Sequence, residues 1–387
     1  MYGCWVMSKG GNNYHFFLSF LLLFIGIEVQ GQVSQAWRYN YPEFDTRAEN
    51  QLLFRLENNN FMKNNEYFGE YVEGYTLLGY AIQPSVMYYA GSRLRFKAGL
   101  HLLEYSGVNK FTEVIPVISV HAKLTDQLDL IMGALRGDVH HEMLEPLFDG
   151  ERQYFRPVET GLQFIYNSPR YYMDTWLDWE QFIFNGDEIP EKFTAGVNSR
   201  LTLTNPIGKW DVSLPFQMVA THLGGQISDY TEEMQSLANI MTGLRLSRKL
   251  GDGFLRKMSL ATYFMWYQDL TQVSGLPFDL GQAFYPVMDL TYKYGDLMFG
   301  YWQARNFIAP KGSPLFQSIS MYRPDFYNEY RYMATGKLSY TRTFLKQIKF
   351  SLVFEGYYDI PASQFDYAYG VNLVFTPNFS ITKIAFN

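Results

Sequence analysis

Residues 365–375 read Phe-Asp-Tyr-Ala-Tyr-Gly-Val-Asn-Leu-Val-Phe, with a large apolar side chain at every second position. Successive side chains of a β-strand point to opposite faces, so this stretch predicts a strand with one aromatic, apolar face and one small or polar face. The same alternation recurs through most of the chain, and no apolar run after the N-terminus is long enough for a membrane helix. We therefore expect a closed β-barrel in an outer membrane.

The composition favours a membrane barrel over other classes of protein. The chain contains 32 Phe and 31 Tyr, yet its mean hydropathy is slightly negative at -0.18. A helical membrane protein would need spans of about 20 apolar residues. A soluble β-protein would normally cover its aromatic residues with polar outer faces. The net charge of -6 argues against a nucleic-acid partner, because nucleic-acid-binding proteins usually carry a basic excess.

The N-terminus predicts a secretory signal peptide. Lys9 supplies the positive charge, residues 16–27 supply the apolar region, and Gly31 is a small residue suited to cleavage before Gln32. Cleavage would remove Cys4, the single cysteine, so we expect no disulfide and no cysteine nucleophile in the mature chain. The predicted organisation is a signal peptide at 1–31, a short periplasmic segment at 32–47 and an outer-membrane barrel at 48–387.

Tight turns and long polar connections alternate along the chain. Gly91-Ser92 and Gly295-Asp296 are typical of tight turns, whereas 138–155 and 308–328 are long connections. Bacterial outer-membrane barrels show this asymmetry, with the short turns on the periplasmic side. Counting across the connections predicts an all-β fold, a transmembrane antiparallel up-and-down β-barrel of about 16 strands, with 14 to 18 left open.

Charged faces of the strands are expected to line the interior. A charge that faces hydrocarbon costs about 2–4 kcal/mol at the membrane midplane. The predicted pore-lining residues are Arg93, Arg95, Lys97, His101, His121, Lys123, Glu159, Asp174, Asp178, Glu180, Asp211 and Lys349. Basic and acidic members on opposing walls would set a transverse field across the pore, or else each charge pairs with its neighbours. Trp179, Trp210 and Trp302 are expected in the aromatic girdles at the membrane interfaces.

Two short stretches carry a resemblance to a known family. They are Asn-Asn-Glu-Tyr-Phe at 64–68 and Gly-Tyr-Thr-Leu-Leu-Gly-Tyr at 74–80, followed by Pro84. They resemble the first strands of a porin-like outer-membrane β-barrel family of the Bacteroidota. The resemblance implies the fold and the location, and it brings no active site with it.

One long loop holds a candidate cation site. Its histidines and carboxylates are Asp138, His140, His141, Glu142, Glu145 and Asp149. Such groups can bind a divalent cation such as zinc. Adjacent histidines on an irregular loop seldom converge on one ion, so a solvated or constriction-forming loop is the favoured interpretation, and we expect neither metal nor cofactor.

A catalytic serine would need a base beside it. Ser119 and His121 share a strand face that points to the lumen, with His101 on the neighbouring strand, whereas a lipase centre would need its serine on the lipid face. His222 ends a strand and could face the outer interface, but it has no obvious serine partner in the sequence. We therefore expect no enzymatic activity.

The interpretation that follows is a passive, porin-like channel for small polar solutes. A barrel of about 16 strands can leave an aqueous channel, whereas one of about 8 strands is filled by side chains. The alternative is a scaffold or docking partner for surface lipoproteins or another envelope complex, and an outer-membrane hydrolase is the less favoured third interpretation. Outer-membrane lipids are the expected surroundings, and a homo-oligomer is left open.

Overall fold

The computed structural model describes residues 44–136, 141–205, 208–225, 229–230, 234–271, 275–345 and 347–383. The predicted signal peptide and most of the predicted periplasmic segment lie outside this part of the chain. Within it, no helix is both long and apolar enough to cross a membrane.

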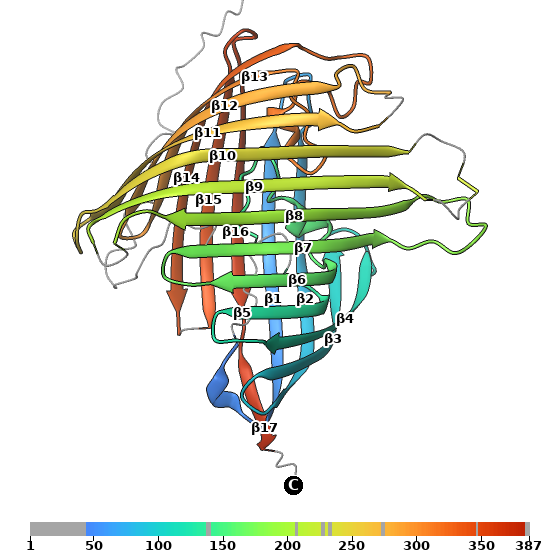
Figure 1. Ribbon diagram of the computed structural model, residues 1–387, viewed down its shortest axis with the longest axis vertical. Coiled ribbons are helices and arrows are strands. Elements are labelled where there is room, and N and C mark those ends of the chain that lie inside the picture. Colours follow the sequence, from blue (N-terminus) through green and yellow to red (C-terminus); the bar gives the residue numbers. More distant parts are fainter. Residues whose placement is uncertain are drawn as a thin grey trace, which may run out of the picture. The chain divides into compact units, whose positions relative to one another are not determined.

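The chain is built almost entirely of strands (Figure 1). They are β1 (Gln51–Glu66), β2 (Tyr75–Ala90), β3 (Leu94–Tyr105), β4 (Glu113–Lys123), β5 (Leu128–Ala134), β6 (Thr160–Asn167), β7 (Tyr171–Gln181), β8 (Glu191–Thr202), β9 (Trp210–Gly224), β10 (Gln235–Lys249), β11 (Leu255–Asp269), β12 (Leu280–Tyr292), β13 (Gly295–Arg305), β14 (Tyr330–Phe344), β15 (Ile348–Asp359), β16 (Gln364–Phe375) and β17 (Asn378–Lys383). The described residues also include three short helices, η1 (Thr46–Ala48), α2 (Arg152–Phe155) and η3 (Pro314–Phe316).

The strands close into a barrel. Each strand pairs in antiparallel fashion with the next, and β1 pairs with β2 on one side and with β16 and β17 on the other. Segments β16 and β17 form one closing strand that is interrupted at Thr376 and Pro377, because β16 pairs with one half of β1 and β17 with the other half. The result is a 16-strand antiparallel up-and-down barrel, as the sequence predicts.

Short turns lie at one end of the barrel and long connections at the other. The segments 91–93 and 293–294 are tight turns, whereas 135–159 and 306–329 are long connections. In bacterial outer-membrane barrels the short turns are periplasmic, so the long connections lie on the extracellular side. This orientation puts the last residues of β9 and the first residues of β10 at the extracellular rim.

Alternation sorts the side chains into an apolar outer wall and a buried inner wall. On β16, Phe365, Tyr369 and Leu373 are exposed on the outer wall, whereas Ala368 and Asn372 are buried on the inner wall. The outer wall carries most of the exposed large apolar side chains, as a surface in contact with hydrocarbon requires.

Trp302 departs from the predicted aromatic girdle. Trp179 and Trp210 are exposed on the outer wall, but Trp302 is fully buried inside the barrel, beside the rings of Tyr285, Phe307 and Phe316. The strand phase explains the difference, since Trp302 shares its face of β13 with the buried Ala304. The girdle prediction for Trp302 is therefore wrong.

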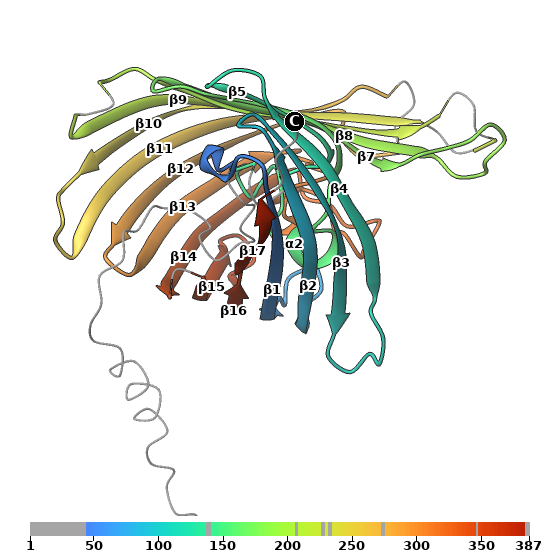
Figure 2. The same cartoon turned by 90° about the horizontal axis from the view of Figure 1, so that it is seen from below.

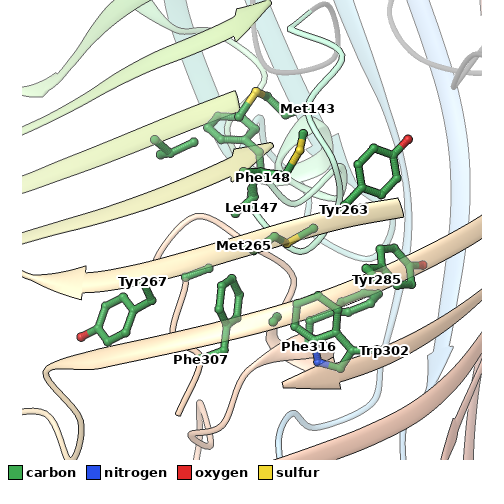
Figure 3. Packing of buried hydrophobic residues seen from close by; sticks show 14 of the residues in the cluster. Met143, Leu147, Phe148, Tyr263, Met265, Tyr267, Tyr285, Trp302, Phe307 and Phe316 are labelled. Atoms are coloured by element: carbon green, nitrogen blue, oxygen red, sulfur yellow. The ribbon is translucent and has the colours of Figure 1, made fainter. Parts of the chain in front are cut away.

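The interior of the barrel holds an apolar core (Figure 3). Inward-facing residues of the strands, such as Met265 and Tyr285, pack against Leu147 and Phe148 of one connection and Phe316 of another. We call the two connections, residues 141–158 and 306–329, the lumen plug. The second figure views the strands from below, with α2 of the plug within the curve that they form (Figure 2).

The two parts of the plug bind each other and the wall. The Asp149 N–H donates to the Lys311 carbonyl at 2.6 Å, and the Ser313 N–H donates to the Glu145 carbonyl at 3.0 Å. Tyr154 packs on Phe61 of β1 with ring centroids 4.8 Å apart. The plug is thus a folded unit docked on the inner wall.

Candidate functional site

The predicted pore-lining residues on strands face inward, but they are not exposed to an open channel. Arg95 is only 1% exposed, Lys97 4% and Asp174 0%. An open aqueous pore would leave such groups in contact with water. Asp211 and Lys349 are partly buried near the periplasmic ends of β9 and β15. Arg93 lies in the turn before β3 rather than on the inner wall, because the strand begins at Leu94, and it pairs with Asp126 at 3.0 Å.

Most of these charges pair locally. Lys97 pairs with Glu57 at 3.2 Å, and Arg55 pairs with the same carboxylate at 2.8 Å. Lys123 pairs with Asp129 at 2.8 Å. On the acidic side, Glu180 binds Lys311 of the plug and Arg156, and Asp178 accepts the Thr160 N–H at 2.9 Å. These charged side chains therefore pair with oppositely charged neighbours, which is the alternative to a transverse field across the pore.

His141 of the plug is held between two of the predicted lining residues. Its Nδ1 lies 2.9 Å from Asp174 Oδ2, and its Nε2 lies 2.8 Å from Glu159 Oε2. Its ring stacks on Trp176 with centroids 3.6 Å apart and planes 9° apart. The other face of Trp176 is accommodated by Gly196, where an added Cβ would meet the indole at 2.1 Å.

Burial alone would lower the pKa of the His141 imidazole, but Asp174 and Glu159 outweigh burial and raise it to about 9. His141 is therefore charged at neutral pH. The pKa of the Asp149 carboxyl is also raised, to about 8, because of burial and then the charges of Glu151 and Glu145. Both groups thus bind a proton at neutral pH when the plug is docked.

The candidate cation site does not assemble in the part of the chain that the structure describes. Asp138 and His140 lie outside the described residues. Glu145 instead accepts a hydrogen bond from the Tyr357 hydroxyl at 2.7 Å, and His141 turns to Asp174 and Glu159. Among described residues, no group of three His, Cys, Asp or Glu side chains is arranged to hold a metal ion.

The lumenal serine alternative is not arranged for catalysis either. His121 Nδ1 lies 3.2 Å from Arg95 Nη2, and its Nε2 lies 3.4 Å from Asp129 Oδ2. Both His121 and Ser119 are buried on the inner wall, away from any lipid. The imidazole is thus engaged by charged groups of the wall.

A serine–histidine pair does lie on the outer wall. His222 Nδ1 is 2.8 Å from Ser236 Oγ, and the two residues are directly opposite in the register of β9 and β10. Gln217 and Val219 of β9 are buried on the inner wall, so His222, at an even position, faces outward. Ser236 faces outward for the same reason, because Leu237 is buried. We call Ser236 and His222 the outer-wall dyad.

The serine partner of His222 was missed from the sequence because the connection 225–234 separates the two residues. Only the register of the two strands brings them together. The sequence held one indication of the pair. The alternation of each strand points both side chains outward, and both residues lie close to the ends of the same extracellular connection. The statement that His222 lacks a serine partner is corrected.

Apolar and hydrogen-bonding groups surround the dyad. Phe193 stacks on His222 with ring centroids 4.9 Å apart, and Trp179 lies 5.7 Å beyond it. Met234 and Leu270 are exposed at the same rim. Both backbone groups of Ser236 are hydrogen-bonded to the segment after β11, since its N–H donates to Thr271 Oγ1 at 3.0 Å and its carbonyl accepts the Leu270 N–H at 2.8 Å. A serine and a histidine are thus held together, hydrogen-bonded, at a lipid-facing position.

The fold is that of an outer-membrane barrel, and it carries a hydrogen-bonded serine–histidine pair on its outer surface. The chain belongs to the lipid A 3'-O-deacylase-type family, whose model matches residues 44–384. The expectation that the chain is not an enzyme is overturned by this membership, because the family is named for an enzyme. The dyad explains the error, since its two halves meet only in the folded barrel.

Solved structures with a similar fold are outer-membrane proteins. OprD from Pseudomonas aeruginosa is 10% identical and has a TM-score of 0.49, with 85% of this chain and 94% of that chain covered. The loop L8 deletion mutant of OmpT from Vibrio cholerae is 11% identical, with a TM-score of 0.49 and coverage of 84% and 99%. OccAB4 from Acinetobacter baumannii is 10% identical, with a TM-score of 0.49 and coverage of 85% and 98%. Curated proteins gave no match.

Proposed function

We propose that this barrel is an outer-membrane hydrolase that removes an ester-linked acyl chain from a lipid of the outer leaflet, with Ser236 as nucleophile and His222 as base. The observation that carries the proposal is the hydrogen bond of 2.8 Å between the two side chains on the lipid-facing wall. Their place at the extracellular rim is the level of the outer leaflet. Membership of a family named for lipid A deacylation supports this class of substrate.

The chemistry follows from the hydrogen bond. Nδ1 of His222 takes the hydroxyl proton as Ser236 Oγ attacks the ester carbonyl, and the imidazolium returns that proton to the departing alcohol oxygen. Water then hydrolyses the acyl-serine with the same base. Because Nδ1 must be free to accept, the neutral imidazole carries its proton on Nε2.

Glu191 is the group that we assign to hold this tautomer. It lies opposite Gly224 in the register of β8 and β9, on the same outer face as His222. A Cβ at Gly224 would lie 3.1 Å from His222 Nε2 and 2.8 Å from Met234 Cγ, so the absence of a side chain makes room for the imidazole and Met234 on this face. Side chains of opposing strands are about 5 Å apart at Cβ, within reach of a glutamate.

Replacing Glu191 by glutamine should lower kcat for ester hydrolysis about 10-fold and leave KM unchanged, because the substitution weakens the acceptor that orients the base without altering the lipid contacts. The measurement is the initial rate of fatty-acid release over a range of substrate mole fractions. Glu188→Gln, an exposed carboxylate of the preceding loop, is the control. An equal effect of both substitutions would remove Glu191 from the site.

The test of the proposed function uses the purified barrel in vesicles that contain lipid A. Mass spectrometry should detect a lipid that has lost one acyl chain, together with the matching free fatty acid. Absence of both products under conditions where the barrel is folded would contradict the proposal. Vesicles of glycerophospholipid alone distinguish a general acyl-ester hydrolase from one that requires lipid A.

A channel for small polar solutes is the second candidate, favoured by the charged inner wall of a 16-strand barrel. The docked plug fills the interior of this wall, so passive diffusion would require the plug to move. Docking of a surface lipoprotein and homo-oligomerisation stay predictions.

A further inference from the structure

We propose that the lumen plug is a releasable gate held by two proton-dependent latches, and that its release at alkaline pH opens the barrel to small ions and polar solutes. This inference is independent of ester hydrolysis, because the latches lie on the inner wall and the dyad on the outer wall. It rests on the contacts through which residues 141–158 dock.

The first latch is His141. Both of its ring nitrogens lie at hydrogen-bond distance from carboxylates, Asp174 on β7 and Glu159 before β6. A neutral imidazole has only one N–H and can donate to only one of them, whereas the imidazolium donates to both. Loss of the proton therefore leaves a buried carboxylate facing a bare nitrogen, which is costly in a low-dielectric interior.

The groups around this latch do not replace the proton. Gln163 of β6 donates to Asp174 at 2.8 Å, and Arg152 of α2 approaches Glu159 only to 3.9 Å. Asn198 of β8 donates to the His141 carbonyl, which fixes the backbone rather than the ring. The remaining neighbours of the ring, Trp176 and Phe148, are uncharged.

The second latch is a buried cluster in which acids outnumber bases. Its titratable acids and bases are Glu145, Asp149 and Glu151 from the plug, with Lys63 of β1, Lys337 of β14 and Glu355 of β15 from the wall. Lys63 pairs with Glu151 at 3.3 Å and also with Glu355, and Lys337 pairs with Glu355. The two lysines are thus engaged by two of the four carboxylates.

The hydrogen bonds to Glu145 and Asp149 come from uncharged donors, while the charges of Lys337 and Lys63 partly offset the burial of Glu145. The Tyr357 hydroxyl donates to Glu145, and the Glu151 N–H donates to Asp149 at 3.0 Å. The other titratable side chains near this cluster are Tyr67, Tyr75, Tyr154 and Tyr285. If Glu145 and Asp149 ionise, their carboxylates are buried away from water beside the negative charges of Glu151 and Glu355, which disfavours the docked state.

The two latches respond to pH in the same direction. The pKa of His141 is about 9 when docked against 6.5 in water, so its contribution to docking is complete below pH 6.5 and is lost as pH rises through 9. The pKa of Asp149 is about 8 when docked against 3.8, so its contribution decreases above pH 3.8 and is gone above 8. Burial also raises the pKa of Glu145. Docking therefore weakens on the alkaline side.

The test is the conductance of the full mature barrel in a planar bilayer between about pH 6 and about pH 10. We expect a closed lumen at the acid end and a reversible rise of about 10-fold or more in open probability above about pH 9. Heat-modifiable migration of the same samples must stay that of the folded barrel, so that opening is distinguished from unfolding. A wild-type conductance that is equally high, or equally absent, at both ends of the range overturns the proposal.

Two sets of variants should shift the transition in opposite directions. His141→Gln removes the charge that holds two carboxylates, so opening should occur at lower pH. In the double variant Glu145→Gln/Asp149→Asn, these two side chains stay neutral at every pH, so opening should require a higher pH. Ser236→Ala should gate as the wild type does, and a barrel that gates but does not hydrolyse would separate this inference from the proposed function. Shifts of both latch variants in the same direction would contradict the latches.

Discussion

Replacing Ser236 by alanine should lower kcat/KM for acyl-ester hydrolysis by at least about 1,000-fold. The substitution removes the oxygen that forms the covalent intermediate, and no other hydroxyl in the described residues is hydrogen-bonded to His222. The barrel itself should be unaffected, because Ser236 lies at the rim and its backbone hydrogen bonds to Leu270 and Thr271 remain. Fatty-acid release from lipid A vesicles, followed by mass spectrometry, gives the rate.

The matched control is Thr242→Ala, a hydroxyl that is exposed on the same outer face of the same strand, nearer the membrane centre. It should retain nearly full activity. His222→Asn should lose about as much activity as Ser236→Ala, and the double variant should lose no more than either, because the two residues act as one unit. Full activity in Ser236→Ala would show that hydrolysis occurs elsewhere.

Replacing Leu352 by arginine should destabilise the inserted barrel by about 2–4 kcal/mol, because the side chain faces hydrocarbon near the middle of β15. Leu352 is 41% exposed on the outer wall. The measurement is the free energy of unfolding in lipid vesicles from urea titration, together with the folded fraction in heat-modifiable migration.

Leu345→Arg is the control for this substitution. Leu345 is 85% exposed in the turn between β14 and β15, at the periplasmic end, where a charge meets water and headgroups. Its stability should change by less than about 0.5 kcal/mol. Ser351 is unsuited as a control, since it is fully buried inside the filled barrel. Equal losses in both variants would mean that position 352 does not contact lipid.

The barrel was predictable because its determinants are local. The alternation at 365–375 fixes which side chains of β16 meet lipid, and the hydrocarbon cost of charge fixes the direction of Arg95 and Asp174. The turns fix the strand count in the same way. None of these inferences depends on the register between paired strands.

The dyad and the plug were not predictable for the opposite reason. Ser236 lies opposite His222 only because of the register between β9 and β10, which a ten-residue connection joins. The alternation of side chains along a strand does not predict that register. The plug depends on contacts of Leu147 and Phe148 with apolar side chains of the inner wall. The charged strand faces predict a polar interior instead. His141 shows the same difficulty. The sequence identifies Asp174 and Glu159 as inward-facing residues, but it does not show that both are hydrogen-bonded to His141.

The position of the dyad on a convex wall changes what substrate concentration means for this protein. In the proposed reaction, a lipid in the outer leaflet would reach Ser236 by lateral diffusion along the membrane, without crossing bulk water. The rate should therefore follow the mole fraction of substrate in the leaflet rather than its amount per volume. Adding inert lipid at constant total substrate should slow the enzyme, whereas diluting the whole suspension with buffer should not.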